Sequence, residues 1–175
     1  PGEARKHRQV TDAVHAHDAK ICLQLLHAGR YAYHPLSVAP SKLKAPINPF
    51  TPRALGTRGV ERTIDAFASA ARLAREGGYD GVEIMGSEGY LINQFLSART
   101  NRRRDAWGGA VEQRMRFATE IVRRVRAACG PDFIIIHRLS MLELVPEGSD
   151  WDEIVAQAKA IEAAGATILN TGIGW

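Results

Sequence analysis

One stretch of the chain, residues 78–117, carries most of the side chains that could do chemistry. An apolar run over residues 81–85 stops at two glycines, and Tyr90 follows directly. An amide and an arginine-rich stretch, residues 99–104, come next. A phenol stays protonated at neutral pH and can give its proton to a developing enolate. A strand that ends in such a polar loop is the usual layout of an active site at the mouth of a (β/α) barrel.

Two more polar residues lie in or at the end of apolar runs. Gln24 lies among aliphatic residues, and Arg138 ends the run 133–138. A buried amide without a partner costs about 1–3 kcal/mol, and a buried guanidinium needs an anion. Gln24 could be a satisfied core amide or could hold the edge of a ligand ring. Arg138 could pair with Glu83 on the neighbouring strand, could lie beside a developing negative charge, or could do both.

Strand-like and helix-like segments alternate along the chain. Apolar runs at residues 20–26, 81–85, 133–138 and 166–171 predict strands, and helical periodicity predicts helices over residues 60–76, 111–128 and from Asp150 to about Gly165. Four such βα units make half of an eight-stranded barrel. A doubly wound sheet shares this alternation, but no G-x-G-x-x-G follows a strand. We therefore expect an α/β fold, a single incomplete (β/α) barrel segment over residues 1–175 whose barrel does not close.

Composition excludes several classes of protein. The net charge of +4 is mild, and no aromatic residues interleave with the arginine clusters, so we expect no nucleic-acid partner. No run reaches the roughly 18 apolar residues of a membrane helix, and no signal peptide begins the chain. Cys22 and Cys129 lack metal-ligand spacing, so we expect no metal site and two reduced thiols in a cytoplasmic protein.

Three motifs resemble the flavin-dependent ene-reductases of the Old Yellow Enzyme family. Q-L-L-H-A-G-R at residues 24–30 is similar to the family's Q-L-x-H-x-G-R motif. E-G-Y-L-I-N-Q-F-L-S at residues 88–97 is similar to H-G-Y-L-x-x-Q-F-L, and residues 101–109 match N-x-R-x-D-x-[YW]-G-G, in which we expect Arg103 to pair with Asp105. The resemblance covers essentially the whole chain. It implies strands 3–6 of an FMN-binding (β/α)8 TIM barrel, with Gln24 and Arg138 at the FMN and Tyr90 as proton donor.

Within that family the chain looks most like the bacterial NADPH-dependent 2,4-dienoyl-CoA reductases. The simpler ene-reductases hold the substrate carbonyl with two His, or His and Asn, where this chain has Met85 and Glu88. The segment M-G-S-E-G-Y resembles the dienoyl-CoA pattern instead. The resemblance implies substrate binding by Glu88 and by residues 99–102, which are Arg99, Thr100, Asn101 and Arg102. It also implies a catalytic histidine just after N-T-G-I-G-W, directly after Trp175.

The implied activity is FMN-dependent reduction of 2,4-dienoyl-CoA thioesters, with hydride from the flavin and a proton from Tyr90. In that family electrons reach FMN from NADPH through FAD and a 4Fe–4S cluster, whose sites this chain lacks. The implied partners are an acyl-CoA substrate and the missing remainder of the barrel and reductase domains, without which we expect the segment to be inactive. Alternatives are another iron–sulfur flavoprotein of the superfamily (an amine dehydrogenase, or an NADH oxidase or ene-reductase) and a non-catalytic half-barrel.

Overall fold

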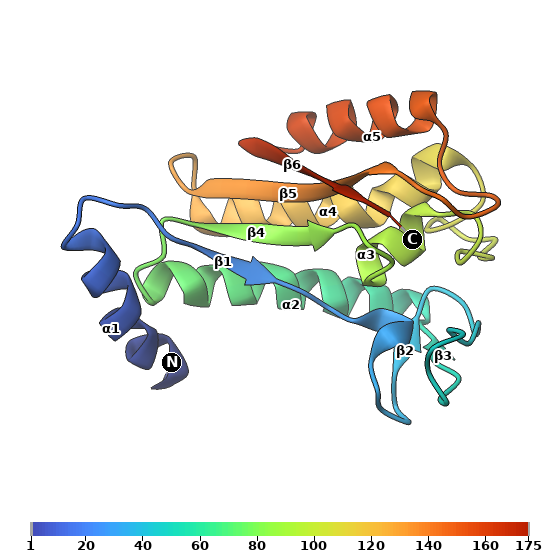
Figure 1. The fold of residues 1–175 in the computed structure, drawn as a ribbon, viewed down its shortest axis with the longest axis horizontal. Helices are drawn as coiled ribbons and strands as arrows, with labels where there is room; N and C mark the ends of the chain where they lie inside the picture. Colours follow the sequence, from blue (N-terminus) through green and yellow to red (C-terminus); the bar gives the residue numbers. More distant parts are fainter. Residues whose placement is uncertain (1, 175) are drawn as a thin grey trace.

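The computed structural model describes residues 2–174 as a twisted parallel sheet with helices packed against it (Figure 1). The elements in chain order are α1 Gly2–His15, β1 Cys22–Leu25, the 3-10 helix η1 Gly29–Tyr31, β2 Val38–Ala39, β3 Arg53–Ala54, α2 Thr57–Glu76, β4 Gly81–Gly86, α3 Leu91–Leu96, α4 Val111–Cys129, β5 Ile134–Leu142, α5 Trp151–Ala163 and β6 Ile168–Ile173.

The main sheet has four strands in the order β1-β4-β5-β6, and every pairing is parallel. All four strands therefore end on the same side of the molecule, where α3 and the small β2–β3 sheet also lie, whereas α1 lies at the opposite end (Figure 1). Within residues 2–174 the outer edges of β1 and β6 have no strand beside them. The sheet is open, as the sequence predicts.

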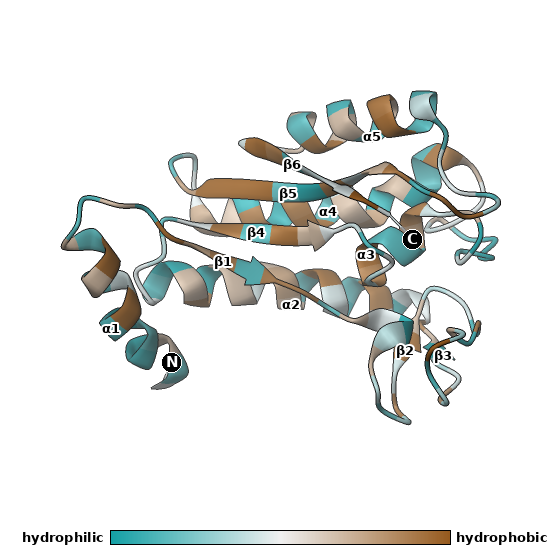
Figure 2. Cartoon of the chain, in the orientation of Figure 1, coloured by the Kyte–Doolittle hydropathy of each residue, from teal (hydrophilic) through white to brown (hydrophobic). Residues whose placement is uncertain are grey.

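The two faces of the sheet differ in chemistry. One face packs against the helices, and its residues Val82, Ile84, Ile135 and Leu139 are at most 1% exposed. The other face carries Gln24, Glu83, Arg138 and Asn170, because side chains alternate along a strand. Figure 2 shows hydrophilic interruptions in the otherwise hydrophobic β1, β4 and β5. In a closed barrel this second face would point inward.

The structure departs from the sequence prediction in four elements. Strand β5 continues to Leu142, whereas the apolar run predicts an end at Arg138. Helix α3 is buried on all sides and so shows no helical periodicity. The two-residue strands β2 and β3 lie in a proline-containing loop and are too short to leave an alternating pattern. The predicted cap is confirmed, since Asp150 Oδ1 accepts a hydrogen bond from the Glu153 N–H at 2.9 Å.

No helix between residues 2 and 174 is long and apolar enough to cross a membrane.

His137 is a fully buried ionisable residue on the helix-covered face. Neither ring nitrogen has a hydrogen-bond partner among residues 2–174, and burial lowers the pKa of His137 to about 4 although Glu83 acts in the opposite direction. A Cβ added at Gly86 would lie 2.3 Å from its Nε2, so the imidazole fits against the bare backbone of β4. The ring is therefore neutral in the folded protein near neutral pH.

This burial predicts an acid-sensitive core. In the unfolded chain His137 has its ordinary pKa of 6.5, so between pH 6.5 and 4 the unfolded state binds the extra proton. The free energy of unfolding should fall by about 3 kcal/mol as the pH drops through that window. His137→Leu should remove this part of the loss in urea unfolding at pH 7 and pH 4.5. The exposed His17 gives a control, His17→Leu. Equal pH dependence in the two variants would contradict the prediction.

Candidate active site

A tight turn after β4 places Glu88 and Tyr90 at the carboxyl end of the sheet. Glu88 and Gly89 both have left-handed backbone, with φ of 59° and 75°. This conformation costs a non-glycine residue roughly 1–2 kcal/mol. Hydrogen bonds hold it: Ser140 Oγ accepts from the Glu88 N–H at 3.3 Å, and Asn93 Oδ1 accepts from the Gly89 N–H at 2.7 Å. Tyr90 then occupies the N-cap position of α3.

Gln94 of α3 joins the turn after β4 to the turn after β1. Its Oε1 accepts from the Arg30 N–H at 3.1 Å, and its Nε2 donates to Gly89 O at 2.7 Å and Ala28 O at 3.3 Å. The side chain is 0% exposed. The sequence prediction missed this role, although an amide within an apolar run is the same signal that singled out Gln24.

The Tyr90 ring is half-buried and held by an aromatic neighbour. It meets Tyr31 edge to face, with the ring centroids 6.1 Å apart and the planes at 86°. The Arg30 guanidinium in turn lies 5.6 Å from the centre of the Tyr31 ring. Among residues 2–174 nothing hydrogen-bonds to the Tyr90 hydroxyl. A fixed ring with a free hydroxyl is what a proton donor to a bound ligand requires.

Arg138 forms an ion pair with Glu88 and not with Glu83. Its Nε and Nη2 donate to Glu88 Oε1 at 2.9 and 2.7 Å. The expected pairing of Arg138 with Glu83 is therefore wrong. The chain turns after β4 ends at Gly86, and this turn places Glu88 next to Arg138 and Ser140 of β5. The Arg138 side chain remains 29% exposed on the inner face. Glu88, predicted as a substrate-binding residue, thus binds the predicted flavin-binding arginine.

Glu83 instead joins two amides across the sheet. Gln24 Nε2 donates to Glu83 Oε2 at 2.7 Å, and Asn170 Nδ2 donates to Glu83 Oε1 at 2.5 Å. Gln24 is exposed, because the inner face of the open sheet is uncovered. Its side chain has a partner, and its Oε1 remains available as an acceptor.

The inner face could hold a planar heteroaromatic ring. Gly172 of β6 lies beside the Arg138–Glu88 pair, and a Cβ there would lie 3.1 Å from Glu88 Oε1 and 3.4 Å from Arg138 Nε. The bare backbone of Gly172 lets the Arg138–Glu88 pair lie close against β6, on the same face as the Gln24 amide. A donor and an acceptor of this kind fit the polar edge of an isoalloxazine, which carries both carbonyl oxygens and an N–H. The predicted residues Gln24 and Arg138 are therefore compatible with a flavin.

The four predicted residues 99–102 divide into two buried and two exposed side chains. Thr100 and Asn101 are 2% and 4% exposed. Thr100 donates to Gln94 O at 2.9 Å, and Asn101 donates to Phe95 O and Trp107 O, each at 2.7 Å. These two side chains hold the loop and do not face a substrate. Direct substrate contact remains a prediction for Arg99 and Arg102, which are exposed.

Both exposed arginines reach the loop after β5. Arg99 Nη1 lies 3.5 Å from Pro146 O, and Arg102 Nη2 lies 2.6 Å from Glu147 Oε2. Arg103, by contrast, is a framework residue: its Nε and Nη2 bind both Asp105 oxygens, at 2.9 and 2.5 Å. The pairing expected from the sequence is confirmed, and it lowers the pKa of Asp105.

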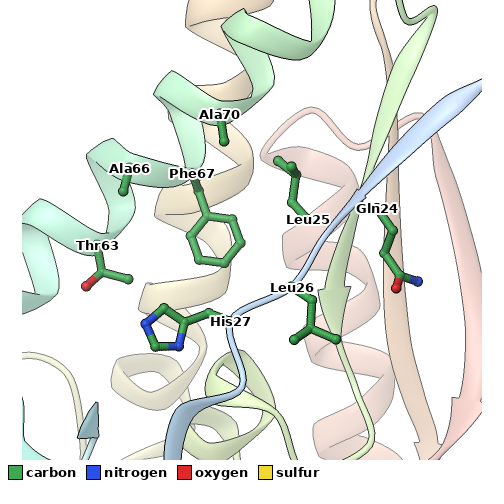
Figure 3. A pocket seen from close by; sticks show the side chains of 8 residues that line it. All are labelled: Gln24, Leu25, Leu26, His27, Thr63, Ala66, Phe67 and Ala70. Carbon is green, nitrogen blue, oxygen red and sulfur yellow. The ribbon is translucent and has the colours of Figure 1, made fainter. Parts of the chain in front are cut away.

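A hollow of about 300 Å³ runs along the free edge of β1 (Figure 3). Its lining is mostly apolar and comes from the β1 segment and α2, namely Gln24, Leu25, Leu26, His27, Thr63, Ala66, Phe67 and Ala70. Burial lowers the pKa of His27. This edge is where the preceding strand of a closed barrel would pair, so the hollow belongs to the open side of the sheet.

Between residues 2 and 174 no group of three or more His, Cys, Asp or Glu side chains could hold a metal ion. The histidine expected directly after Trp175 lies outside the described residues.

The three hydrogen bonds of Gln94 predict a large effect of its removal. Gln94→Leu keeps a similar volume but leaves the Arg30 N–H and the Gly89 carbonyl without partners in a buried place. We expect the free energy of unfolding to fall by about 2–4 kcal/mol in urea titrations. The control is Gln113→Leu at an exposed position, which removes the hydrogen bond that Gln113 Oε1 accepts from the Ala110 N–H at 3.2 Å and should cost about 1 kcal/mol or less. Equal losses in the two variants would refute the role given to Gln94.

Several known proteins are similar to this chain in sequence and in fold. The family described as NADH:flavin oxidoreductase / NADH oxidase matches residues 2–175. A metal reductase of Desulforamulus reducens is 41% identical over 172 residues, which cover 96% of this chain and 26% of that protein. A 2-naphthoyl-CoA reductase bound to 2-naphthoyl-CoA superimposes with a TM-score of 0.90 at 32% identity, over 97% of this chain and 28% of that one.

An Old Yellow Enzyme homologue from Zymomonas mobilis superimposes with a TM-score of 0.86 at 31% identity, over 96% of this chain and 52% of that one. The chain thus spans about a quarter to a half of the length of these relatives. The predicted fold, an α/β barrel segment that does not close, is confirmed. The chain belongs to the NADH:flavin oxidoreductase / NADH oxidase family, which is the Old Yellow Enzyme type, and this membership implies FMN and NAD(P)H as its cofactors.

Proposed function

We propose that this chain is the central part of the flavin barrel of a reductase acting on conjugated thioesters, with 2,4-dienoyl-CoA as the substrate class. The observation that carries the proposal is the position of Tyr90. Its ring is half-buried, its hydroxyl has no hydrogen-bond partner among residues 2–174, and it lies at the same end of the sheet as the Arg138–Glu88 pair. A proton donor beside a flavin site is what addition of hydride to a conjugated double bond requires.

The proposed roles of the inner-face residues follow from their charges. FMN, when bound, supplies the hydride. Arg138 places positive charge beside the ring edge where reduction develops negative charge, and Gln24 offers an amide to the same polar edge. Glu88 fixes the guanidinium through its Nε and Nη2, so the side chain is held before any ligand arrives. Such preorganisation lowers the cost of orienting the cation during the reaction.

Tyr90 gives its proton to the substrate carbon next to the thioester carbonyl. Tyr31 packs edge to face against the Tyr90 ring, and Asn93 and Gln94 of α3 hold the backbone of Gly89, the residue directly before Tyr90. The proton donor is therefore positioned by groups that do not themselves react.

The substrate class is supported by what the site lacks. Met85 is only 5% exposed and is apolar, and Glu88 is engaged with Arg138. At these two positions the simpler ene-reductases place donors for the carbonyl of a small enone. Arg99 and Arg102 are exposed cations on the loop that follows α3, where guanidinium groups would suit the phosphates of coenzyme A.

The electron route from NADPH through FAD and a 4Fe–4S cluster is part of the same proposal. It requires further barrel strands and reductase domains as partners, and it would operate in the cytoplasm, where thiols such as Cys22 and Cys129 stay reduced.

A second candidate is an NADH oxidase or ene-reductase of the same superfamily. The family description favours it directly, because it names NADH oxidase. The two candidates differ in what oxidises the flavin: a dienoyl-CoA thioester in the first, and oxygen or a small enone in the second.

Tyr90→Phe tests the proposed acid. In the flavin-loaded enzyme we expect reduction of the flavin by NADPH to continue, and its reoxidation by dienoyl-CoA to slow by about 10²–10⁴-fold. Rapid-mixing absorbance separates the two half-reactions. Tyr79→Phe is the matched control, because Tyr79 lies just before β4, at the other end of the sheet, where its hydroxyl meets His7 Nδ1 at 2.8 Å. Unchanged reoxidation in Tyr90→Phe would remove Tyr90 from the mechanism.

The substrate class has its own test. A dienoyl-CoA thioester should have a kcat/KM at least tenfold above that of cyclohexenone, since the site lacks two donors for a small carbonyl. Arg99→Ala combined with Arg102→Ala should raise the KM of the thioester about tenfold and leave flavin content unchanged. Arg62→Ala on α2 serves as the control. A preference for cyclohexenone, or indifference to the loss of both arginines, would favour the second candidate.

A further inference from the structure

A second hollow, of about 340 Å³, lies between the loop that contains β2 and β3 and the loop that follows α3. Its lining comes from both loops, namely Pro40, Ser41, Lys42, Ala54, Arg102, Arg103, Arg104 and Asp105. In Figure 1 the β2–β3 unit lies at the end of the molecule where β1 and β4 finish. The hollow is therefore at the same end of the sheet as Tyr90.

The walls of this hollow are fixed by one arginine. The Arg103 side chain is only 9% exposed. Its Nη1 donates to Pro40 O at 3.1 Å and also to Leu55 O, while Asp105 holds its other nitrogens. The Arg102 N–H adds a hydrogen bond to Ser41 Oγ at 2.9 Å. The two loops are thus tied together without help from Lys42 or Arg104.

The charges around the hollow do not balance. Both oxygens of Asp105 already bind Arg103, so this carboxylate neutralises no other cation. Arg102 has Glu147 as a partner. Among residues 2–174 Lys42 and Arg104 form no ion pair or hydrogen bond, and both are exposed. Two uncompensated cations beside a preformed hollow attract an anion, and low salt strengthens that attraction.

We propose that this hollow binds a phosphate group of a nucleotide-bearing ligand, with Lys42 and Arg104 as the cations that contact it. Arginine and lysine both bind phosphate through charge-assisted hydrogen bonds. Coenzyme A and NADPH both carry such phosphates, so the shared chemistry defines the site. The choice of coenzyme A as the occupant rests on the proposed function, whereas the phosphate site itself does not.

Binding measurements on the flavin-loaded holoenzyme test the site. Isothermal titration with coenzyme A and with NADPH compares the wild type with Lys42→Ala, Arg104→Ala and the double variant. We expect the double variant to raise the Kd of coenzyme A about tenfold at low salt and to weaken its salt dependence. Lys42→Arg, which keeps the positive charge, should retain most of the affinity for coenzyme A that Lys42→Ala loses. Arg62→Ala combined with Lys159→Ala removes the same two charges elsewhere and should leave the Kd unchanged.

A pantetheine thioester of the dienoic acid has no phosphate. It therefore distinguishes loss of phosphate binding at the hollow from loss of the reduction step. Its turnover should be the same in the wild type and the double variant, because Lys42 and Arg104 contact only the phosphate. If the double variant loses NADPH affinity and keeps coenzyme A affinity, the phosphate site stands and its occupant is the dinucleotide. If binding of coenzyme A depends on both cations but no thioester is reduced, the proposed function fails and the site stands. Unchanged Kd values for both ligands would overturn the site.

Discussion

The arrangement of the site depends on two buried amides in α3. Gln94 joins the turn after β1 to the turn after β4, and Asn93 extends the connection to the loop after β5, where its Nδ2 donates to Glu143 Oε1 at 2.5 Å. Three strand ends that could move independently are thereby held at fixed relative positions. The arrangement leaves no space at Gly29, which has a φ of +61° and whose added Cβ would lie 2.3 Å from Gln94 Oε1. A buried network of this kind is strong only when every member has a partner.

The Arg138–Glu88 pair gives the inner face a different electrostatic character from that of a lone arginine. A ligand beside Arg138 also lies near the Glu88 carboxylate, which offsets part of the positive charge that the ligand meets. The pair keeps an exposed cation in one orientation and offsets the cost of the left-handed backbone at Glu88. Glu88 therefore orients the Arg138 guanidinium and, through it, any ligand that Arg138 binds. A pair that is partly solvated contributes modestly to stability, so its main effect is on orientation.

The sequence predicted those parts of the fold that repeat and missed those that depend on distant contacts. Apolar runs located β1, β4, β5 and β6, and helical periodicity located α2, α4 and α5, because each element buries one face. The partner of Arg138 could not be predicted, since it depends on how the chain turns after Gly86. Thr100 and Asn101 matched a motif by position, but the motif does not record which side chains point into the loop. The two residues of α3 that hold the site were visible only as amides in an apolar run, a pattern that is equally common in ordinary cores.

The open edges of the sheet show which contacts form within this chain and which would need further strands. Apolar side chains on β6 and beside β1 are exposed, with Ile168 at 48%, Ile173 at 61% and Leu26 at 45%. Such residues would be covered when further strands complete a barrel. The position of Tyr90 does not depend on that closure, because α3, η1 and the loop after β5 all lie within the chain and contact the same turn. Closure would instead exclude water from the inner face and surround a ligand bound there. Tyr90 and the residues that support it are thus positioned within this chain, whereas further barrel strands would be needed to enclose a ligand.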